Sequence, residues 1–104
     1  MKAVAALAAL AQEHRLAAFR FLVERGTSGA AAGEVAAALD RPASSLSFHL
    51  AHLTRAGMIQ QRRMGRSLNY AVDYAAMSEL MGYLTENCCG GADCSPAAVS
   101  ETAA

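Results

Sequence analysis

The chain has 104 residues, of which 54% are hydrophobic, 17% charged and only 6% aromatic, with no tryptophan. This length fits one compact domain, and so high an apolar fraction excludes disorder over most of the chain. Much of the apolar content is alanine, so the core of a monomer is expected to be thin, and pairing with a second subunit would enlarge it.

The sequence contains no candidate membrane span, because no stretch approaches the roughly 20 continuous apolar residues that a span needs. The beginning, MKAVAALAALAQ, imitates a signal peptide, with a lysine ahead of a short apolar run. It is shorter than the roughly 15–30 residues usual for such a peptide. We therefore expect a cytoplasmic protein that begins with a helix.

Charge is distributed unevenly along the chain. Nine basic residues balance nine acidic ones, yet residues 41–72 contain five arginines and no acidic residue. The arginines of this segment are Arg41, Arg55, Arg62, Arg63 and Arg66. A neutral protein that gathers its basic residues in this way offers one basic face, which predicts phosphate as a partner.

Two helices are predicted at the beginning of the chain. Val4, Leu7 and Leu10 recur at helical spacing and indicate a first helix over about residues 2–11. A second helix follows and ends at Gly26, since glycine commonly terminates helices. Its apolar stripe consists of Leu16, Phe19, Leu22 and Val23.

The next segment predicts a loop and then a pair of helices. Residues 27–33 are expected to form the loop and residues 34–39 a short helix, which ends before Pro42 because proline disfavours helical backbone in the preceding residue. A fourth helix is expected over residues 43–56. Its buried face consists of Leu46, Leu50 and Leu53. We expect Ser44 or Ser45 to cap it and Gly57 to end it.

The spacing of the apolar residues changes after the fourth helix. Residues 58–64 and 67–72 flank Gly65-Arg66, and apolar residues alternate in the second segment, which is typical of a β-hairpin. Glycine at the first position of a two-residue loop suits a type II′ turn. A last helix is predicted from about Ala75 to near Gly90. Its apolar stripe consists of Met77, Leu80, Met81 and Leu84.

This order of elements, α-α-α-α-β-β-α, predicts a mainly α fold with a β-hairpin, the winged helix-turn-helix. The fourth helix would be the recognition helix and the hairpin the wing. Hydroxyls, imidazoles and guanidiniums contact phosphates and base edges, and a phenyl ring can contact a thymine methyl. The candidate DNA-binding residues are Ser44, Ser45, Ser47, Phe48, His49, His52, Arg55, Arg62, Arg63 and Arg66.

From Leu7 to about Leu84 the sequence resembles the ArsR/SmtB family of winged-helix metalloregulators. EHRLAAFRFL is similar to the opening of the family's second helix, EVAAAL to its third, SSLSFHLAHLTRAGMI to its recognition helix and QQRRMGRSLNYAV to its wing. The resemblance implies a homodimeric repressor that binds double-stranded operator DNA when metal-free and leaves it when an inducer binds. It also implies a dimer interface formed by the first and last helices. Residues 1–87 would form this domain, and residues 88–104 a cysteine-bearing C-terminal segment.

All three cysteines lie in that segment, at Cys88, Cys89 and Cys94. Two metal motifs of the family are missing, because GAAAGEV stands in place of a Cys-Val-Cys element and residues 73–86 contain no histidine. Thiolates select soft ions, and structural zinc normally needs four ligands, whereas trivalent arsenic is satisfied by three sulfurs. The paired cysteines and the third resemble one arsenite-site variant of the family. We therefore expect As(III) or Sb(III) as the inducer.

Three alternatives use the same cysteines differently. A repressor of the same fold could sense cadmium or lead, or it could sense oxidants through a disulfide between Cys89 and Cys94. A thiol enzyme with Cys88 or Cys89 as nucleophile is disfavoured, since the sequence lacks a CxxC element, a phosphate-binding loop and a nearby Cys/His pair. We expect no enzymatic activity and no catalytic cofactor.

Overall fold

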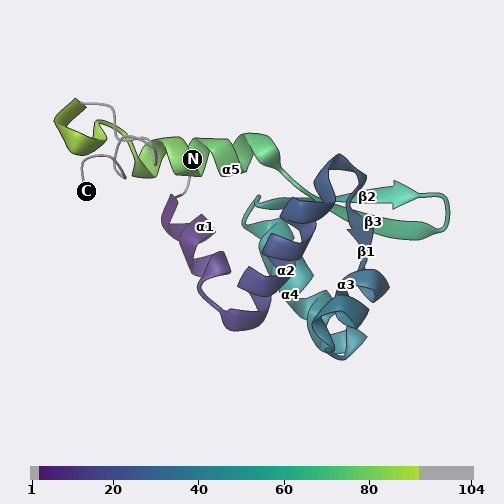
Figure 1. Ribbon diagram of the computed structural model, residues 1–104. Coiled ribbons are helices and arrows are strands. Elements are labelled where there is room, and N and C mark those ends of the chain that lie inside the picture. The colour runs from purple at the N-terminus through teal and green to yellow at the C-terminus, as the bar shows by residue number, and fades with distance from the viewer. Residues whose placement is uncertain (1–2, 92–104) are drawn as a thin grey trace, which may run out of the picture.

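The computed structural model describes residues 3–91 and gives the predicted order of helices and hairpin (Figure 1). The helices are α1 (Ala3–Leu10), α2 (Glu13–Arg25), α3 (Ala32–Leu39), α4 (Ala43–Arg55) and α5 (Tyr74–Leu84). The strands are β1 (Ala30–Ala31), β2 (Ile59–Met64) and β3 (Ser67–Val72). Two 3₁₀ turns are η1 (Gly26–Ser28) and η2 (Cys88–Gly91). The predicted winged helix-turn-helix fold is confirmed.

The three strands form one antiparallel sheet in the order β1-β3-β2. The hairpin is in full register from Ile59–Val72 to Met64–Ser67, and Gly65 has a positive φ of 66° while Arg66 does not. That combination agrees with the predicted type II′ turn. The loop expected at residues 27–33 is only partly a loop, because it contains η1, β1 and the start of α3. A two-residue strand is too short to leave a periodic signal in the sequence.

The core lies where α2 and α4 pack against each other and against the sheet. The three leucines predicted for the buried face of α4 have no exposed surface. The largest fully buried side chains are Leu22, Leu46, Leu50, Leu53, Met58, Ile59 and Val35. These residues fix how α4 is rotated about its axis, and therefore which side chains it presents to solvent.

The two ends of α4 differ in how well they follow the prediction. Pro42 occupies the N-cap position and its carbonyl accepts from the Leu46 N–H at 3.1 Å, so the expected serine cap is wrong. At the other end the predicted role of Gly57 is confirmed. Gly57 has φ +79° and the following N–H, of Met58, donates to the Leu53 carbonyl at 3.1 Å.

The last helix is shorter than predicted, since α5 ends at Leu84 rather than near Gly90. The Thr85 hydroxyl donates to the Met81 carbonyl at 2.8 Å, and Asn87 then adopts a left-handed backbone, with φ 56°. Asparagine tolerates this conformation because its short polar side chain can hydrogen-bond locally.

Several large apolar side chains of the predicted stripes lie on the surface instead of in the core. Leu16 of α2 is 45% exposed, and the α1 and α5 stripes are exposed at Val4, Leu7, Met81 and Leu84. Small side chains take the inner positions, namely Ala6 and Ala9 on α1, which lets this helix lie close to the core. Among residues 3–91, no helix is both long enough and apolar enough to cross a bilayer.

Candidate DNA-binding and sensing sites

The face of α4 opposite the buried leucines carries the residues predicted to contact DNA. Ser44, Ser45 and Ser47 are exposed, and Phe48 has 64% of its surface exposed. This phenyl ring lies outside the hydrophobic core, edge-on to the ring of the neighbouring His49. His49 and His52, on the side of this face that adjoins α2, are half-buried.

His49 packs against His14 on α2, which no motif in the sequence indicates. Its ring centroid lies 5.7 Å from that of His14 on α2 and 5.8 Å from that of Phe48. Its Nδ1 is buried and has no hydrogen-bond partner among the residues that the structure describes. Burial, and then the charges of Arg15, His14 and His52, lower the pKa of His49 below its ordinary value. Both effects favour the neutral form of the His49 imidazole.

This lowered pKa makes the free energy of unfolding depend on pH. The unfolded chain protonates His49 near the ordinary pKa of about 6.5, whereas the folded chain resists the proton until a lower pH. The unfolded state thus binds more protons in the window below about pH 6.5, and stability falls as the pH falls through it. We expect His49→Gln to flatten the decrease in melting temperature between about pH 7 and pH 5. If the melting temperatures of the variant and the wild type fell equally with pH, this prediction would be wrong.

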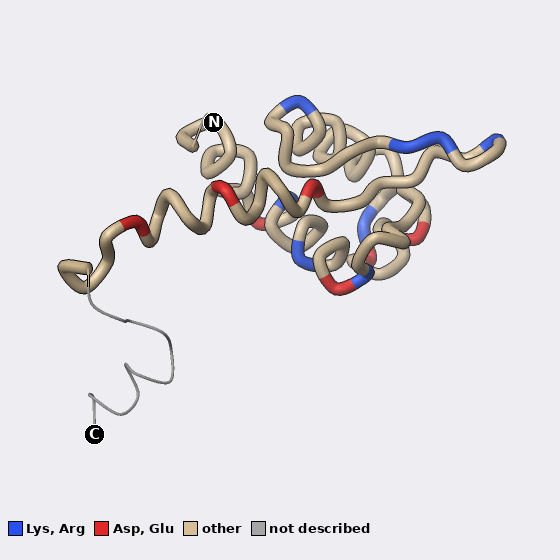
Figure 2. Tube along the Cα trace, turned by 90° about the horizontal axis from the view of Figure 1, so that it is seen from above, with Lys and Arg blue, Asp and Glu red and all other residues tan. Residues whose placement is uncertain are grey.

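Basic side chains extend from α4 along the hairpin. Arg63 and Arg66 are exposed at the far end of the wing, and Arg55 is exposed at the end of α4. Figure 2 shows basic positions along the hairpin and no acidic ones. None of these three guanidiniums has a hydrogen bond or ion pair within residues 3–91, so each is available to a phosphate.

Arg62 differs from its neighbours on the wing. It is half-buried, and its Nη2 donates to the carbonyl of Thr27 at 2.6 Å, across 35 positions of sequence. Its guanidinium is therefore engaged with the protein, unlike that of Arg63. The sequence could not reveal this, because the acceptor is a main-chain carbonyl and carries no residue signature.

The predicted sensing cysteines lie beyond the end of α5. Cys88 is half-buried in η2 and is disulfide-bonded, while Cys89 is exposed with a free thiol and a left-handed backbone, φ 57°. Cys94 lies outside the described residues. Within residues 3–91, no three Cys, His, Asp or Glu side chains converge as a metal site. The disulfide between Cys89 and Cys94, one of the alternatives, is not the arrangement found, because Cys89 is free.

Comparison with known proteins assigns this arrangement to a family. A helix-turn-helix domain family matches residues 10–62, which span α2, the whole helix-turn-helix and the first half of the wing. HlyU from Vibrio cholerae, solved in its reduced form, is 34% identical over 80% of this chain and 87% of its own, with a TM-score of 0.62. The chain belongs to the ArsR/SmtB family of winged-helix regulators.

Further solved structures agree with this assignment. The transcriptional repressor BigR from Xylella fastidiosa is 25% identical over 83% of this chain and 85% of its own, with a TM-score of 0.62. A possible transcriptional regulator for arsenical resistance is 29% identical over 75% and 78% of the two chains, with a TM-score of 0.63. No curated protein matches the sequence significantly.

Membership in this family defines the general activity of the chain. It is a DNA-binding transcriptional regulator and not an enzyme. The matched residues 10–62 include every selected position on α4. They exclude Arg63 and Arg66 of the wing and all three cysteines.

Proposed function

We propose that this ArsR-family regulator is a homodimeric repressor of an operator, released by trivalent arsenic or antimony. The observation that best supports DNA binding is the division of α4 into a buried and an exposed face. Leu46, Leu50 and Leu53 are fully buried, and the opposite face, with Ser47 and Phe48, is free in an acid-free segment. In a helix-turn-helix that face enters the major groove.

The wing supports α4 by a different kind of contact. Guanidiniums bind phosphates whatever the base sequence, so Arg63 and Arg66 would supply affinity and α4 would supply discrimination. The absence of acidic residues between positions 41 and 72 removes repulsion from the DNA backbone over this whole surface. Arg41 and Arg55 add exposed charge near the two ends of α4.

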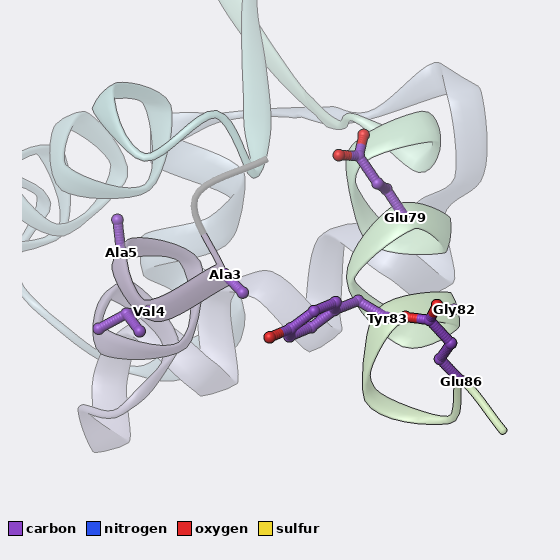
Figure 3. A pocket seen from close by; sticks show the side chains of 7 residues that line it. All are labelled: Ala3, Val4, Ala5, Glu79, Gly82, Tyr83 and Glu86. Atoms are coloured by element: carbon purple, nitrogen blue, oxygen red, sulfur yellow. The ribbon is translucent and has the colours of Figure 1, made fainter. Parts of the chain in front are cut away.

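A second copy of the chain is the proposed occupant of the α1–α5 face, which lies at the end of the molecule away from the wing tip (Figure 1). A groove of about 650 Å³ runs between these helices, and the ring of Tyr83 on α5 points toward Ala3 on α1 (Figure 3). Val4 and Tyr83 are 81% and 59% exposed, apolar surface that a partner would cover. Sedimentation equilibrium of the intact chain should give twice its mass of 10.8 kDa, and a monomer at all concentrations would contradict the dimer.

The donor set of the C-terminal segment supports arsenic as the inducer. Three thiols can replace the three hydroxyls of As(OH)₃, which forms three As–S bonds and releases three waters. Sulfur ligands favour such soft ions over magnesium or calcium, which prefer oxygen. Cys88 and Cys89 lie next to each other in a turn that already leaves helical geometry, so closing it around an ion need not break α5.

Redox sensing is the second candidate, and the disulfide at Cys88 favours it. Oxidation of two thiols to a disulfide would change the same segment, with peroxide as the oxidant that is reduced to water. The two candidates separate in one titration. Arsenite releases DNA from the reduced protein in the first, whereas peroxide releases it and a thiol reductant restores binding in the second.

Operator binding tests the DNA-binding half of the proposal. A duplex selected from a random pool serves as operator and a scrambled duplex as reference, with binding followed by fluorescence anisotropy. We expect Ser47→Ala to reduce operator affinity by about 1–3 kcal/mol and to leave affinity for the scrambled duplex nearly unchanged. The same substitution on α5, Ser78→Ala, is the matched control and should change neither. Equal losses on both duplexes would make Ser47 a backbone contact and contradict its role in discrimination.

A further inference from the structure

Two side chains midway along the wing bind the loop that precedes α3. Arg62 on β2 and Asn69 on β3 are directly opposite each other in the hairpin register. Arg62 Nη2 donates to the Thr27 carbonyl at 2.6 Å, and Asn69 Nδ2 donates to the Ser28 carbonyl at 2.7 Å. One cross-strand pair thus binds two successive carbonyls of η1, and we call these two bonds the wing clamp.

The side chains of the wing clamp are partly buried, which is unusual for polar groups on a hairpin. Asn69 is only 9% exposed, and among residues 3–91 it is the one buried polar residue. The Arg62 Nε is also buried, and it has no partner within that range. Burying polar groups costs free energy unless they are hydrogen-bonded. An arginine that served only solubility would remain exposed, as Arg63 does, so the burial of Arg62 indicates a structural role.

The far side of the same loop is bound to the helix-turn-helix. Arg25 Nε donates to the Gly29 carbonyl at 3.1 Å, and Arg25 Nη2 forms an ion pair with Glu34 at 2.8 Å. Glu34 in turn accepts from the Ala31 N–H at 3.0 Å, at the start of α3. The loop is therefore bonded both to the wing and to the first helix of the DNA-binding unit.

We propose that Arg62 and Asn69 are positioning residues for DNA binding. They fix the wing relative to the helix-turn-helix, so that the exposed arginines of the wing reach phosphates while α4 lies in the major groove. Arg62 acts through the wing and does not contact DNA itself. This inference rests on the DNA contacts under Proposed function, and its test separates the two.

The first measurement uses the free protein, so it does not depend on DNA. Amide hydrogen exchange of residues 29–31 reports on the loop and on β1, which pairs with β3 beside the clamp. We expect Arg62→Ala to speed exchange there by at least about fivefold, because local opening becomes easier. Arg63→Ala, one position along the same strand and without a bond inside the described chain, is the matched control and should leave exchange unchanged.

The second measurement is a double-mutant cycle on operator affinity. Arg62→Ala should weaken binding by about tenfold, the scale of one charge-assisted hydrogen bond. The Arg63→Ala/Arg66→Ala variant should weaken binding to every duplex and lower the slope of log affinity against log salt by about two units. Adding Arg62→Ala to that variant should cost little more, since the contacts that Arg62 positions are already gone.

Two results would overturn the proposal: unchanged exchange in Arg62→Ala, or losses that multiply in the triple variant. The second would mean that Arg62 contacts DNA directly. If the Arg63→Ala/Arg66→Ala variant kept wild-type affinity and salt slope, the proposed wing contact would be wrong, and with it the role of the clamp in DNA binding. The exchange rates would still report whether the clamp holds the loop.

Discussion

Gly29→Ala should destabilise this protein by about 3 kcal/mol or more, through two effects that add. Gly29 has φ 63° and ψ −157°, a conformation that essentially only glycine adopts. A Cβ at this position would also collide with the carbonyl oxygen of Tyr70 on β3. That oxygen belongs to the main chain of the central strand and cannot rotate away. For a chain of this size we expect the melting temperature to fall by about 10–20 °C.

Two other glycines separate the backbone strain from the collision with Tyr70. Gly26 has a similar backbone, with φ 68° and ψ −151°, but open space around its missing Cβ. Gly26→Ala should therefore cost only the backbone strain, about 1–3 kcal/mol. Gly33 lies in α3 with open space and a helical backbone, so Gly33→Ala should be neutral or stabilise by up to about 1 kcal/mol. If Gly29→Ala and Gly26→Ala were equally destabilising, the collision with Tyr70 would be unimportant.

The parts of the fold that follow a periodic pattern could be predicted from the sequence. Leu46, Leu50 and Leu53 recur at helical spacing and are buried, and Gly65 occupies the turn at the hairpin centre. Both signals are local, because spacing and turn chemistry act over a few residues. The exposed face of α4 follows directly from its buried face, which is why its candidate contacts could be selected without a structure.

The interactions that act across the chain could not be predicted in this way. Arg62 has the same residue type and nearly the same position as Arg63, yet it bonds to a carbonyl 35 positions away. His14 meets His49 from another helix, and nothing in the spacing of the two indicates it. In the predicted stripe of α5 only Leu80 is buried, while Met81 and Leu84 are exposed, because a stripe does not tell whether its partner is the same chain or another.

Hydrogen bonds join the start of α5 to α2 and to the hairpin. The Tyr74 hydroxyl donates to the Val23 carbonyl at 2.9 Å, which joins α5 to the end of α2. Asp73 caps α5 at the Ala76 N–H and accepts from Gln60 on β2 at 3.2 Å. A movement of α5 would therefore reach the hairpin and α2 through hydrogen bonds, and in the proposed dimer it would change the spacing of the two recognition helices.

Cys89→Ser and Cys94→Ser should each bind operator like the wild type and fail to respond to arsenite. Serine nearly keeps the size of cysteine but loses the soft thiolate, and Cys89 is exposed and distant in sequence from the α4 face, so DNA contacts should be unaffected. In the reduced wild-type protein we expect arsenite to weaken operator binding by about 5–150-fold, a coupling of about 1–3 kcal/mol. Anisotropy titrations with arsenite, antimonite, cadmium and zinc in the presence of reductant measure this for all three proteins.

The set of responses distinguishes the proposed inducers from one another. Release by arsenite and antimonite but not by zinc follows from a site of three sulfurs, because structural zinc normally takes four ligands. Release of DNA by cadmium alone would make a divalent soft ion the inducer instead of arsenic or antimony. Release of DNA only by peroxide would favour the disulfide at Cys88 as the signal. If both serine variants kept the full response to arsenite, the sensing site would lie elsewhere. The two substituted thiols would then have no part in induction. An inducer changes DNA affinity only when it binds the DNA-bound and the DNA-free forms of the protein with different affinities.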